Sequence, residues 1–298
     1  MNTKDLDYFN QIILQKNFSK VASFFDVSQP TITMAVKRLE AEFGATLIIR
    51  DRVHNDITVT ASGRQLAEHA EIILRQLNIA HQEINNLTEQ QIVLGLPPII
   101  ENHYFPPIAA KLEKAGLLGN IQTLEGGSNA MRDAVRDGRV DMTLLGSVDP
   151  VAYTSLIAEE FDRAPFSIFV SKDHPLANRK RIYFSELRHE NFVFFNSNFV
   201  HNTAFNRLTR RNHFRPNIVF RSNDTHMLMK VISENVGVGF LTNIVDHYID
   251  DVVQLELLDD EQPEFITSIV YRTSHILTPP QLKLLEILHA SLEPEKPV

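Results

Sequence analysis

The chain has 298 residues, of which 43% are hydrophobic, and this predicts a folded protein of about two domains. It contains no cysteine, which excludes disulfides, thiol catalysis and cysteine-ligated zinc. No run approaches the roughly 20 apolar residues that cross a bilayer, and the opening residues lack the apolar core of a signal peptide, so we expect a cytoplasmic protein with no membrane partner. The net charge of −8 argues weakly against nucleic-acid binding. Residues 16–64, however, carry seven basic and five acidic side chains, so the acidity lies mostly elsewhere.

Three helices are predicted within the first 44 residues. The first has apolar residues at helical spacing, namely Leu6, Phe9, Ile13 and Leu14. The second is expected to begin at Ser19, a good N-cap, and to have an apolar face of Val21, Ala22 and Phe25. The third has Ser28 as N-cap, Pro30 in its first turn and Gly44 at its end. Its expected buried stripe is Ile32, Val36, Leu39 and Phe43.

The second and third helices, joined by a tight turn at Asp26 and Val27, form a helix-turn-helix. The third helix would enter the major groove, where Gln and Thr can contact base edges and Lys and Arg can contact phosphates. Two short alternating runs, 47–50 and 57–60, predict a β-hairpin wing. The alternative is a three-helix fold with a solvated charged face, but the order of the elements favours DNA binding. The expected DNA-binding residues are Ser28, Gln29, Pro30, Thr31, Thr33, Met34, Lys37, Arg38, Arg50 and Arg52.

A long helix is predicted over residues 61–88, because apolar residues recur there with alternating spacings of four and three. This heptad seam favours pairing with a second copy of the chain, although the stripe could instead pack on its own domain. A two-fold dimer would pair two recognition helices and predicts an interrupted palindrome as the DNA site. The expected dimerisation residues are Leu66, Ala70, Ile73, Leu77, Ala80, Ile84 and Leu87.

From residue 91 onward, strands alternate with helices, which predicts an α/β domain with a parallel, doubly wound sheet in two lobes. Strands are expected at 91–96, 121–125, 141–146, 166–171, 192–195, 218–220, 238–241 and 265–271. Helices are expected at 103–115, 129–137, 199–211, 225–234 and 279–292. The predicted domains are therefore 1–60, 61–88 and 91–298.

A small-molecule effector is expected between the lobes, where strand ends and helix starts converge. For any single residue there, ordinary capping or turn formation is the alternative. Pro97-Pro98 offers no side-chain hydrogen bond at the first loop. The expected effector-binding residues are Pro98, Ile99, Gly127, Ser128, Gly146, Ser147, Asn196, Ser197, Asn198, Thr225, His226 and Phe240.

Motifs for phosphate loops, nucleophilic serines and zinc peptidases are absent, and Gly237-Val238-Gly239 lacks the third glycine of a dinucleotide site. Asp141 and Glu125 are isolated carboxylates, which are usually structural. We therefore expect no catalysis, no cofactor and no metal. An enzyme or small-molecule binding protein with an accessory helix-turn-helix, and a purely architectural DNA binder, are the alternatives. The large two-lobed domain argues against the last of these.

The N-terminal pattern closely resembles the LysR-type transcriptional regulators. It consists of Leu6, Phe9, Phe18, Val21-Ala22, the run from Val27 to Thr33, the run from Lys37 to Glu40, Leu47, Arg50, Thr60 and Gly63. The resemblance implies a winged helix-turn-helix, a linker helix and a two-lobed domain like the periplasmic binding proteins. It implies that the chain crosses between the lobes twice, so that lobe I is formed by 91–161 plus 267–298 and lobe II by 162–266. It further implies that the chain binds promoter DNA and a small effector as a dimer or tetramer, and that RNA polymerase is a partner. Met34 departs from the family, which often has Arg at that position.

Two segments, Asn2 to Phe9 and Gln29 to Glu40, are similar to regulators of malolactic fermentation in lactic bacteria. This similarity implies a carboxylate effector such as malate. A dicarboxylate would suit helix N-termini and the side chains of Asn and Ser.

Overall fold

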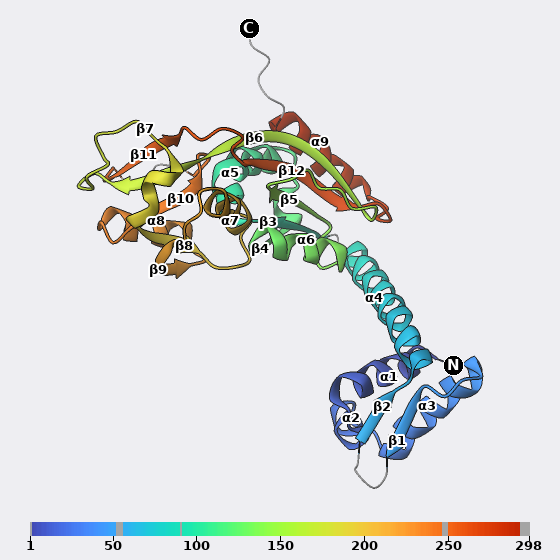
Figure 1. Cartoon of the computed structure of the whole chain (residues 1–298). Coiled ribbons are helices and arrows are strands. Elements are labelled where there is room, and N and C mark those ends of the chain that lie inside the picture. The colour runs from blue at the N-terminus through green and yellow to red at the C-terminus, as the bar shows by residue number, and fades with distance from the viewer. Residues whose placement is uncertain (1, 52–55, 90, 246–249, 293–298) are drawn as a thin grey trace. The chain divides into compact units, whose positions relative to one another are not determined.

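The computed structural model describes residues 2–51, 56–89, 91–245 and 250–292 (Figure 1). The chain divides into two compact units, Met1–Ile84 and Asn85–Val298, which we describe in turn. None of the described helices is long and apolar enough to span a membrane.

The first unit contains the expected helix-turn-helix and wing. Its elements are α1 (Thr3–Gln15), α2 (Phe18–Phe24), α3 (Gln29–Phe43), β1 (Ile48–Asp51), β2 (Asp56–Val59) and the start of α4 (Ala61–Glu89). The strands β1 and β2 pair antiparallel. Asp26 adopts a positive φ of 52° in the turn between α2 and α3, a conformation that Asp tolerates better than most residues. The wing is attached to α3 by Glu40, whose Oε1 accepts the Leu47 N–H at 2.9 Å.

Three details of these helices differ from expectation. The N-cap of α2 is Asn17, whose side chain accepts the Lys20 N–H at 2.9 Å, so Ser19 lies inside the helix. Leu14 is 73% exposed, because the buried face of α1 is formed by Leu6, Phe9 and Ile12 and does not include Leu14. Phe43 is 50% exposed, because the last turn of α3 extends past the core.

The predicted seam on α4 is divided between two environments. Leu66 and Ala70 are buried in the core of the first unit, so at these two positions the helix packs on its own domain. Ile73, Leu77, Ala80, Ile84 and Leu87 are exposed in the single chain, at 37% or more for the four larger side chains. The dimer prediction therefore concerns only the part of α4 after residue 70.

The second unit is built on one mixed sheet with the strand order β4-β3-β5-β12-β6-β10-β8-β9, in which β11 also pairs with β6 and β7 pairs with β11. Its strands are β3 (Ile92–Leu96), β4 (Ile121–Glu125), β5 (Met142–Ser147), β6 (Leu156–Ser171), β7 (Arg181–Ile182), β8 (Asn191–Phe195), β9 (Asn217–Ser222), β10 (Val238–Thr242), β11 (Val252–Leu257) and β12 (Glu264–Arg272). The outer strands pair in parallel as expected. The prediction of a wholly parallel sheet is wrong, since β6 and β12 run antiparallel to their neighbours.

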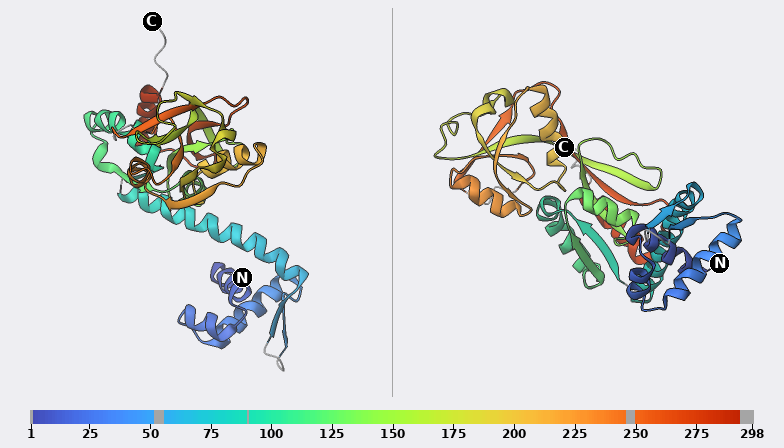
Figure 2. Two further views of the ribbon diagram at one scale, coloured as in Figure 1. Left: turned by 60° about the vertical axis from the view of Figure 1, so that its left-hand side comes forward. Right: turned by 60° about the horizontal axis from the view of Figure 1, so that its bottom comes forward.

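The long strand β6 connects two lobes. Its first part, residues 156–165, pairs with β12, whereas its last part, residues 166–171, pairs with β10 and β11. The chain crosses back between the lobes from β11 to β12. The sequence predicted only the second half of β6, because its first half is rich in charged residues and half-exposed. The right-hand view of Figure 2 shows the lobes apart.

Helices cover both lobes. They are α5 (Pro98–Lys114), α6 (Ser128–Arg136), α7 (His201–Arg211), α8 (Thr225–Ser233) and α9 (Pro279–Leu292), with two 3₁₀ turns, η1 (Leu118–Asn120) and η2 (Phe184–His189). The helix α5 begins five residues before the predicted start at 103. The reason is that Pro98 occupies its first position, where the absent N–H costs no hydrogen bond.

A phenylalanine-rich core fills the sheet's interior near the junction of the lobes. Phe166 stacks on Phe240 with ring centroids 4.9 Å apart, and Phe240 is fully buried. The rings of Phe184, Phe194 and Phe205 pack around the same pair. The prediction that Phe240 forms an effector-binding wall is therefore wrong, because core rings enclose it.

Candidate functional site

The start of the helix α3 presents a row of exposed side chains. Ser28 caps the helix by accepting the Thr31 N–H at 3.3 Å, and its hydroxyl lies 2.9 Å from that of Thr31. The side chains on the outward face are those of Gln29, Pro30, Thr31, Met34 and Lys37. Thr33 is half-buried. This face has the donors, acceptors and apolar groups that read base edges.

The two arginines predicted on this surface have partners within the chain. Arg38 donates to both carboxylate oxygens of Asp5, from Nε at 3.0 Å and from Nη2 at 2.5 Å. The guanidinium of Arg50 lies 3.0 Å from the centre of the Phe18 ring, and its Nη2 donates to Thr33 at 3.2 Å. Arg52 lies outside the described residues.

The larger cavity between the lobes has a volume of about 940 Å³. It lies at the starts of α5, α6 and α8 and at the loop before α7, as expected for convergent strand ends. Five predicted effector residues line it, namely Pro98, Gly127, Asn198, Thr225 and His226.

This larger cavity is acidic. Its charged lining residues are Glu101, Glu125 and Asp224, and among the described residues no Lys or Arg lines it. Burial, followed by repulsion from Glu125, raises the pKa of Glu101 above its ordinary value. Asp224 caps α8 by accepting the His226 N–H at 2.8 Å. A carboxylate effector would meet repulsion here.

A smaller compartment has a volume of about 180 Å³, and its charged lining residues are Arg132 and Asp149. It is lined by the predicted residues Ser128, Gly146 and Ser147, and also by Arg132 and Thr203, which the sequence did not indicate. Ser128 accepts the Gly146 N–H at 3.1 Å. The Ser147 hydroxyl is buried and, within the described part of the chain, has no hydrogen-bond partner.

Arg132 supplies the positive charge of the smaller compartment. Its Nη1 donates to the Asn129 side chain at 3.3 Å, and its Nε forms an ion pair with the exposed Asp133 at 3.5 Å but makes no hydrogen bond. Ser128 is the first residue of α6, and Arg132 follows one turn later. Both side chains therefore lie on the same face of the helix, close to its N-terminus. The remaining acid of the compartment, Asp149, is paired with Arg207 at 3.0 Å.

A close backbone contact lies in the wall of the larger cavity, which Gly127 and Asn198 both line. A Cβ added at Gly127 would lie 2.6 Å from the carbonyl oxygen of Asn198, closer than real side chains approach. Gly127 belongs to the start of α6 and Asn198 to the loop before α7, so the contact joins the two lobes. Glycine is therefore required here for the lobes to approach this closely.

Several predicted effector residues lie elsewhere. Ile99 is 4% exposed and belongs to the core, because it is the second residue of the early-starting α5. Asn196 and Ser197 line neither compartment, and the carbonyl of Asn196 accepts the Asn202 side chain at 2.7 Å. The structure thus divides the predicted set between two compartments, the core and a loop.

One buried histidine stands beside the smaller compartment. His201, at the start of α7, accepts the Thr242 N–H at 3.4 Å and is otherwise surrounded by the rings of Phe166, Phe195 and Phe265. Burial lowers its pKa to about 3, so the ring is neutral at physiological pH.

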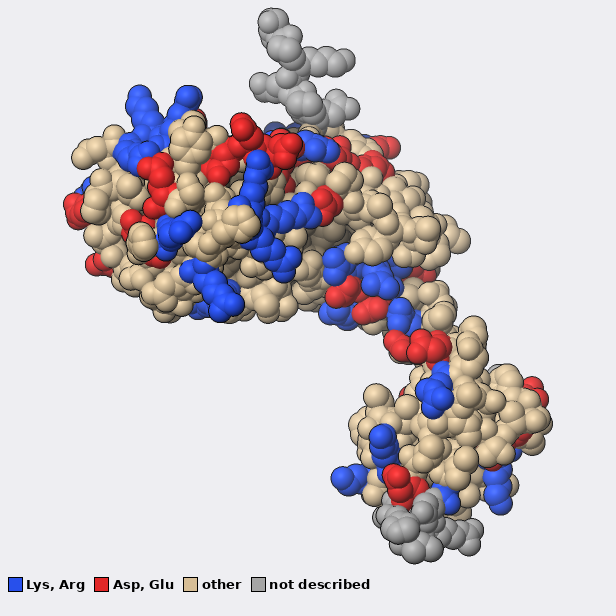
Figure 3. Space-filling view, in the orientation of Figure 1, with Lys and Arg blue, Asp and Glu red and all other residues tan. Residues whose placement is uncertain are grey.

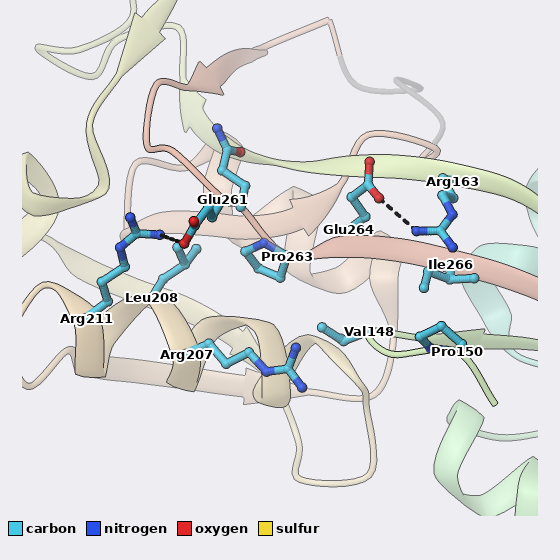
Figure 4. A pocket seen from close by; sticks show the side chains of 11 residues that line it. Val148, Pro150, Arg163, Arg207, Leu208, Arg211, Glu261, Pro263, Glu264 and Ile266 are labelled. Carbon is cyan, nitrogen blue, oxygen red and sulfur yellow. Dashed lines mark hydrogen bonds and ion pairs between the residues drawn. The ribbon is translucent and has the colours of Figure 1, made fainter. Parts of the chain in front are cut away.

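A third cavity, of about 330 Å³, lies between α7 and the crossing strands β6 and β12 (Figure 4). Three arginines line it, but each has an acidic or carbonyl partner. Arg163 pairs with Glu264 at 3.2 Å, Arg211 with Glu261 at 3.8 Å, and Arg207 with Asp149. Figure 3 likewise shows acidic and basic side chains interspersed over the drawn face of the larger unit. Two acids, Glu261 and Glu264, line this cavity beside its arginines.

No group of three potential metal ligands occurs in residues 2–51, 56–89, 91–245 and 250–292.

Two family models match the sequence. Residues 3–64 match the bacterial regulatory helix-turn-helix of the lysR family, and residues 85–293 match the LysR substrate binding domain.

Individual proteins agree with these matches. The malolactic fermentation system transcriptional activator of Lactococcus lactis is 30% identical over 97% of this chain and 98% of its own length. Among solved structures, Corynebacterium glutamicum OxyR superposes with a TM-score of 0.58 at 19% identity, covering 97% of this chain and 91% of that one. The Synechocystis CcmR regulatory domain in complex with 2-PG gives 0.61 at 16% identity, covering 69% and 98%. These two structures share the fold.

Proposed function

This chain belongs to the LysR family of bacterial transcriptional regulators, and we propose that it responds to a short carboxylate bound in its smaller interlobe compartment. It is a DNA-binding regulator with an effector-binding domain, not an enzyme. The proposal concerns the chemistry of the effector and the residues that bind it.

The observation that carries the proposal is the environment of Arg132. Its guanidinium shares the compartment with the buried, unsatisfied Ser147 hydroxyl and with the start of α6. An arginine, a hydroxyl and a helix N-terminus together suit a carboxylate. The larger compartment, lined by three acids, suits it less.

Malate is the first effector to test. The volume of about 180 Å³ accommodates a short organic acid, but not a large aromatic one. The 30% identity to a malolactic fermentation activator supports the same choice. Binding would shift the equilibrium between lobe arrangements and so change the spacing of the DNA-binding units.

On DNA, we propose that Gln29, Thr31 and Met34 read bases in an A/T-containing interrupted palindrome while Lys37 contacts phosphate.

The proposed domain boundaries are 1–60 for the DNA-binding domain, 61–88 for the linker helix and 91–298 for the effector domain. Within the effector domain, lobe I is 91–161 plus 267–298 and lobe II is 162–266. The regulator would act in the cytoplasm as a dimer or tetramer, with RNA polymerase as a further partner.

Malate is expected to raise the melting temperature of the wild-type protein, and Arg132→Ala is expected to abolish this rise. At a hundredfold excess over the dissociation constant, binding contributes about 2.7 kcal/mol, or roughly 5–10 °C for a domain of this size. Differential scanning fluorimetry with malate, succinate and a neutral diol measures the shift. Arg136→Ala is the matched control, because Arg136 is exposed on the same helix and lines neither compartment. An undiminished shift in Arg132→Ala would place the carboxylate elsewhere.

The promoter targets are tested by capturing genomic DNA fragments on the purified protein at physiological salt and sequencing them. We expect enrichment of a few promoters that contain an interrupted palindrome. Retention that disappears with modest salt and enriches no sequence would reduce the binding to a non-specific electrostatic contact. This result would contradict the proposed reading of bases by α3.

A further inference from the structure

We propose that Arg38 does not bind DNA phosphate but positions the recognition helix α3 by clamping the buried carboxylate of Asp5. The inference rests on the proposed placement of α3 in the major groove. By sequence alone, Lys37 and Arg38 are equivalent, since both are basic residues on the same helix. The structure separates them.

Asp5 is an acidic side chain with only 1% of its surface exposed. It lies in the first turn of α1, where its Oδ2 accepts the Asn2 N–H at 3.2 Å and its N–H donates to the Asn2 side chain at 2.9 Å. This capping box fixes the position of the carboxylate. A buried carboxylate needs a compensating charge, because leaving it alone in the interior is costly.

Arg38 supplies that charge through two hydrogen bonds, one to each carboxylate oxygen, at 3.0 and 2.5 Å. A paired, planar geometry of this kind fixes both the distance and the orientation of the two groups. The pair joins the first turn of α1 to the third helix across 33 residues of sequence. It therefore sets how α3 lies on α1, and with it where Gln29 and Thr31 project.

The same pair removes Arg38 as a free charge. Binding to DNA releases counterions in proportion to the phosphates that a protein neutralises. An arginine that is already neutralised by Asp5 adds little to this release. Lys37 is exposed and, within the described part of the chain, has no hydrogen bond or ion pair. It is the free cation of the two.

The test compares Lys37→Gln with Arg38→Gln in the full-length protein. The two variants lose the same charge at adjacent positions, and glutamine at 38 keeps a donor for Asp5, which favours folding. Fluorescence anisotropy with a labelled promoter fragment from the capture experiment gives the slope of log K against log salt. Lys37→Gln should flatten the slope by about 0.9 for each phosphate that the variant no longer neutralises. Arg38→Gln should leave the slope unchanged while binding weakens about tenfold at every salt concentration.

Asp5→Asn supplies the second arm. If the carboxylate acts through Arg38, then Asp5→Asn should also weaken binding, and the double variant Asp5→Asn/Arg38→Gln should lose no more than the worse single variant. A slope flattened as much by Arg38→Gln as by Lys37→Gln would overturn the inference, as would an unchanged affinity in Asp5→Asn. A slope that neither position-37 nor position-38 variant changes would instead contradict the proposed placement of α3.

Discussion

A charge introduced at Leu77 is expected to convert the regulator into monomers and to weaken its binding to a palindromic site by two to four orders of magnitude. Leu77 lies on the 29-residue helix α4, in the stretch where Ile73, Ile84 and Leu87 are also exposed. A glutamate there would have to be buried unpaired between two helices. A monomer engages one half-site only, and the gain of roughly 10²–10⁴ from engaging two is lost.

Sedimentation velocity and binding to a two-half-site fragment measure this effect. Gln76→Glu is the control, since it adds the same charge at the neighbouring exposed position, off the seam. Leu66→Glu should behave differently, because Leu66 is buried in the core of its own unit and its replacement should unfold that unit. An unchanged sedimentation coefficient for Leu77→Glu would show that the chains associate through another surface.

Below about pH 6.5, the effector domain is expected to lose stability because of His201. Burial lowers the pKa of His201 to about 3 in the folded protein, whereas an exposed histidine has a pKa of about 6.5. Between these values the unfolded chain binds the proton and the folded chain does not, so the free energy of unfolding falls as the pH falls. The loss is about 1.4 kcal/mol per pH unit, or about 2 kcal/mol at pH 5.

Urea unfolding at pH 7.5, 6 and 5, followed by circular dichroism, measures this loss. His201→Gln is the comparison, because its side-chain oxygen can accept the Thr242 N–H in place of the ring nitrogen. The wild type should lose about 2 kcal/mol more than His201→Gln between pH 7.5 and 5. Equal losses in the two proteins would mean that His201 is accessible to protons in the folded state.

The local chemistry of the chain predicted the DNA-binding unit well. The cap at Ser28, the proline at position 30 and the αL glycine at position 44 define α3 by interactions within a few residues, which a sequence displays directly. Phe43 was misplaced because periodicity identifies a face of a helix but not where the core beneath it ends. The first half of β6 was missed for a related reason, since its polar residues are paired with β12, more than 90 residues away.

The candidate sites were predictable only in part. Strand ends and helix starts indicated the cleft, and eight of the expected residues line one or other compartment. The sequence could not show that Gly127 and Asn198 meet between the lobes, or that three acids line one compartment and Arg132 lines the other. A same-face search from Ser128 along α6 could have found Arg132. No comparable pattern identifies Asp5, whose partner lies 33 residues away.

The position of the strand β12 makes the sheet of the second unit complete only late in synthesis. This strand lies between β5 and β6 at the centre of the sheet, yet it is among the last segments to be translated. The DNA-binding unit ends near residue 84 and its contacts are local, so it can fold while synthesis continues. A chain that terminates before residue 264 would therefore have an intact helix-turn-helix and a sheet without its central strand. Such a fragment would keep the helix-turn-helix but would lack a complete effector-binding domain.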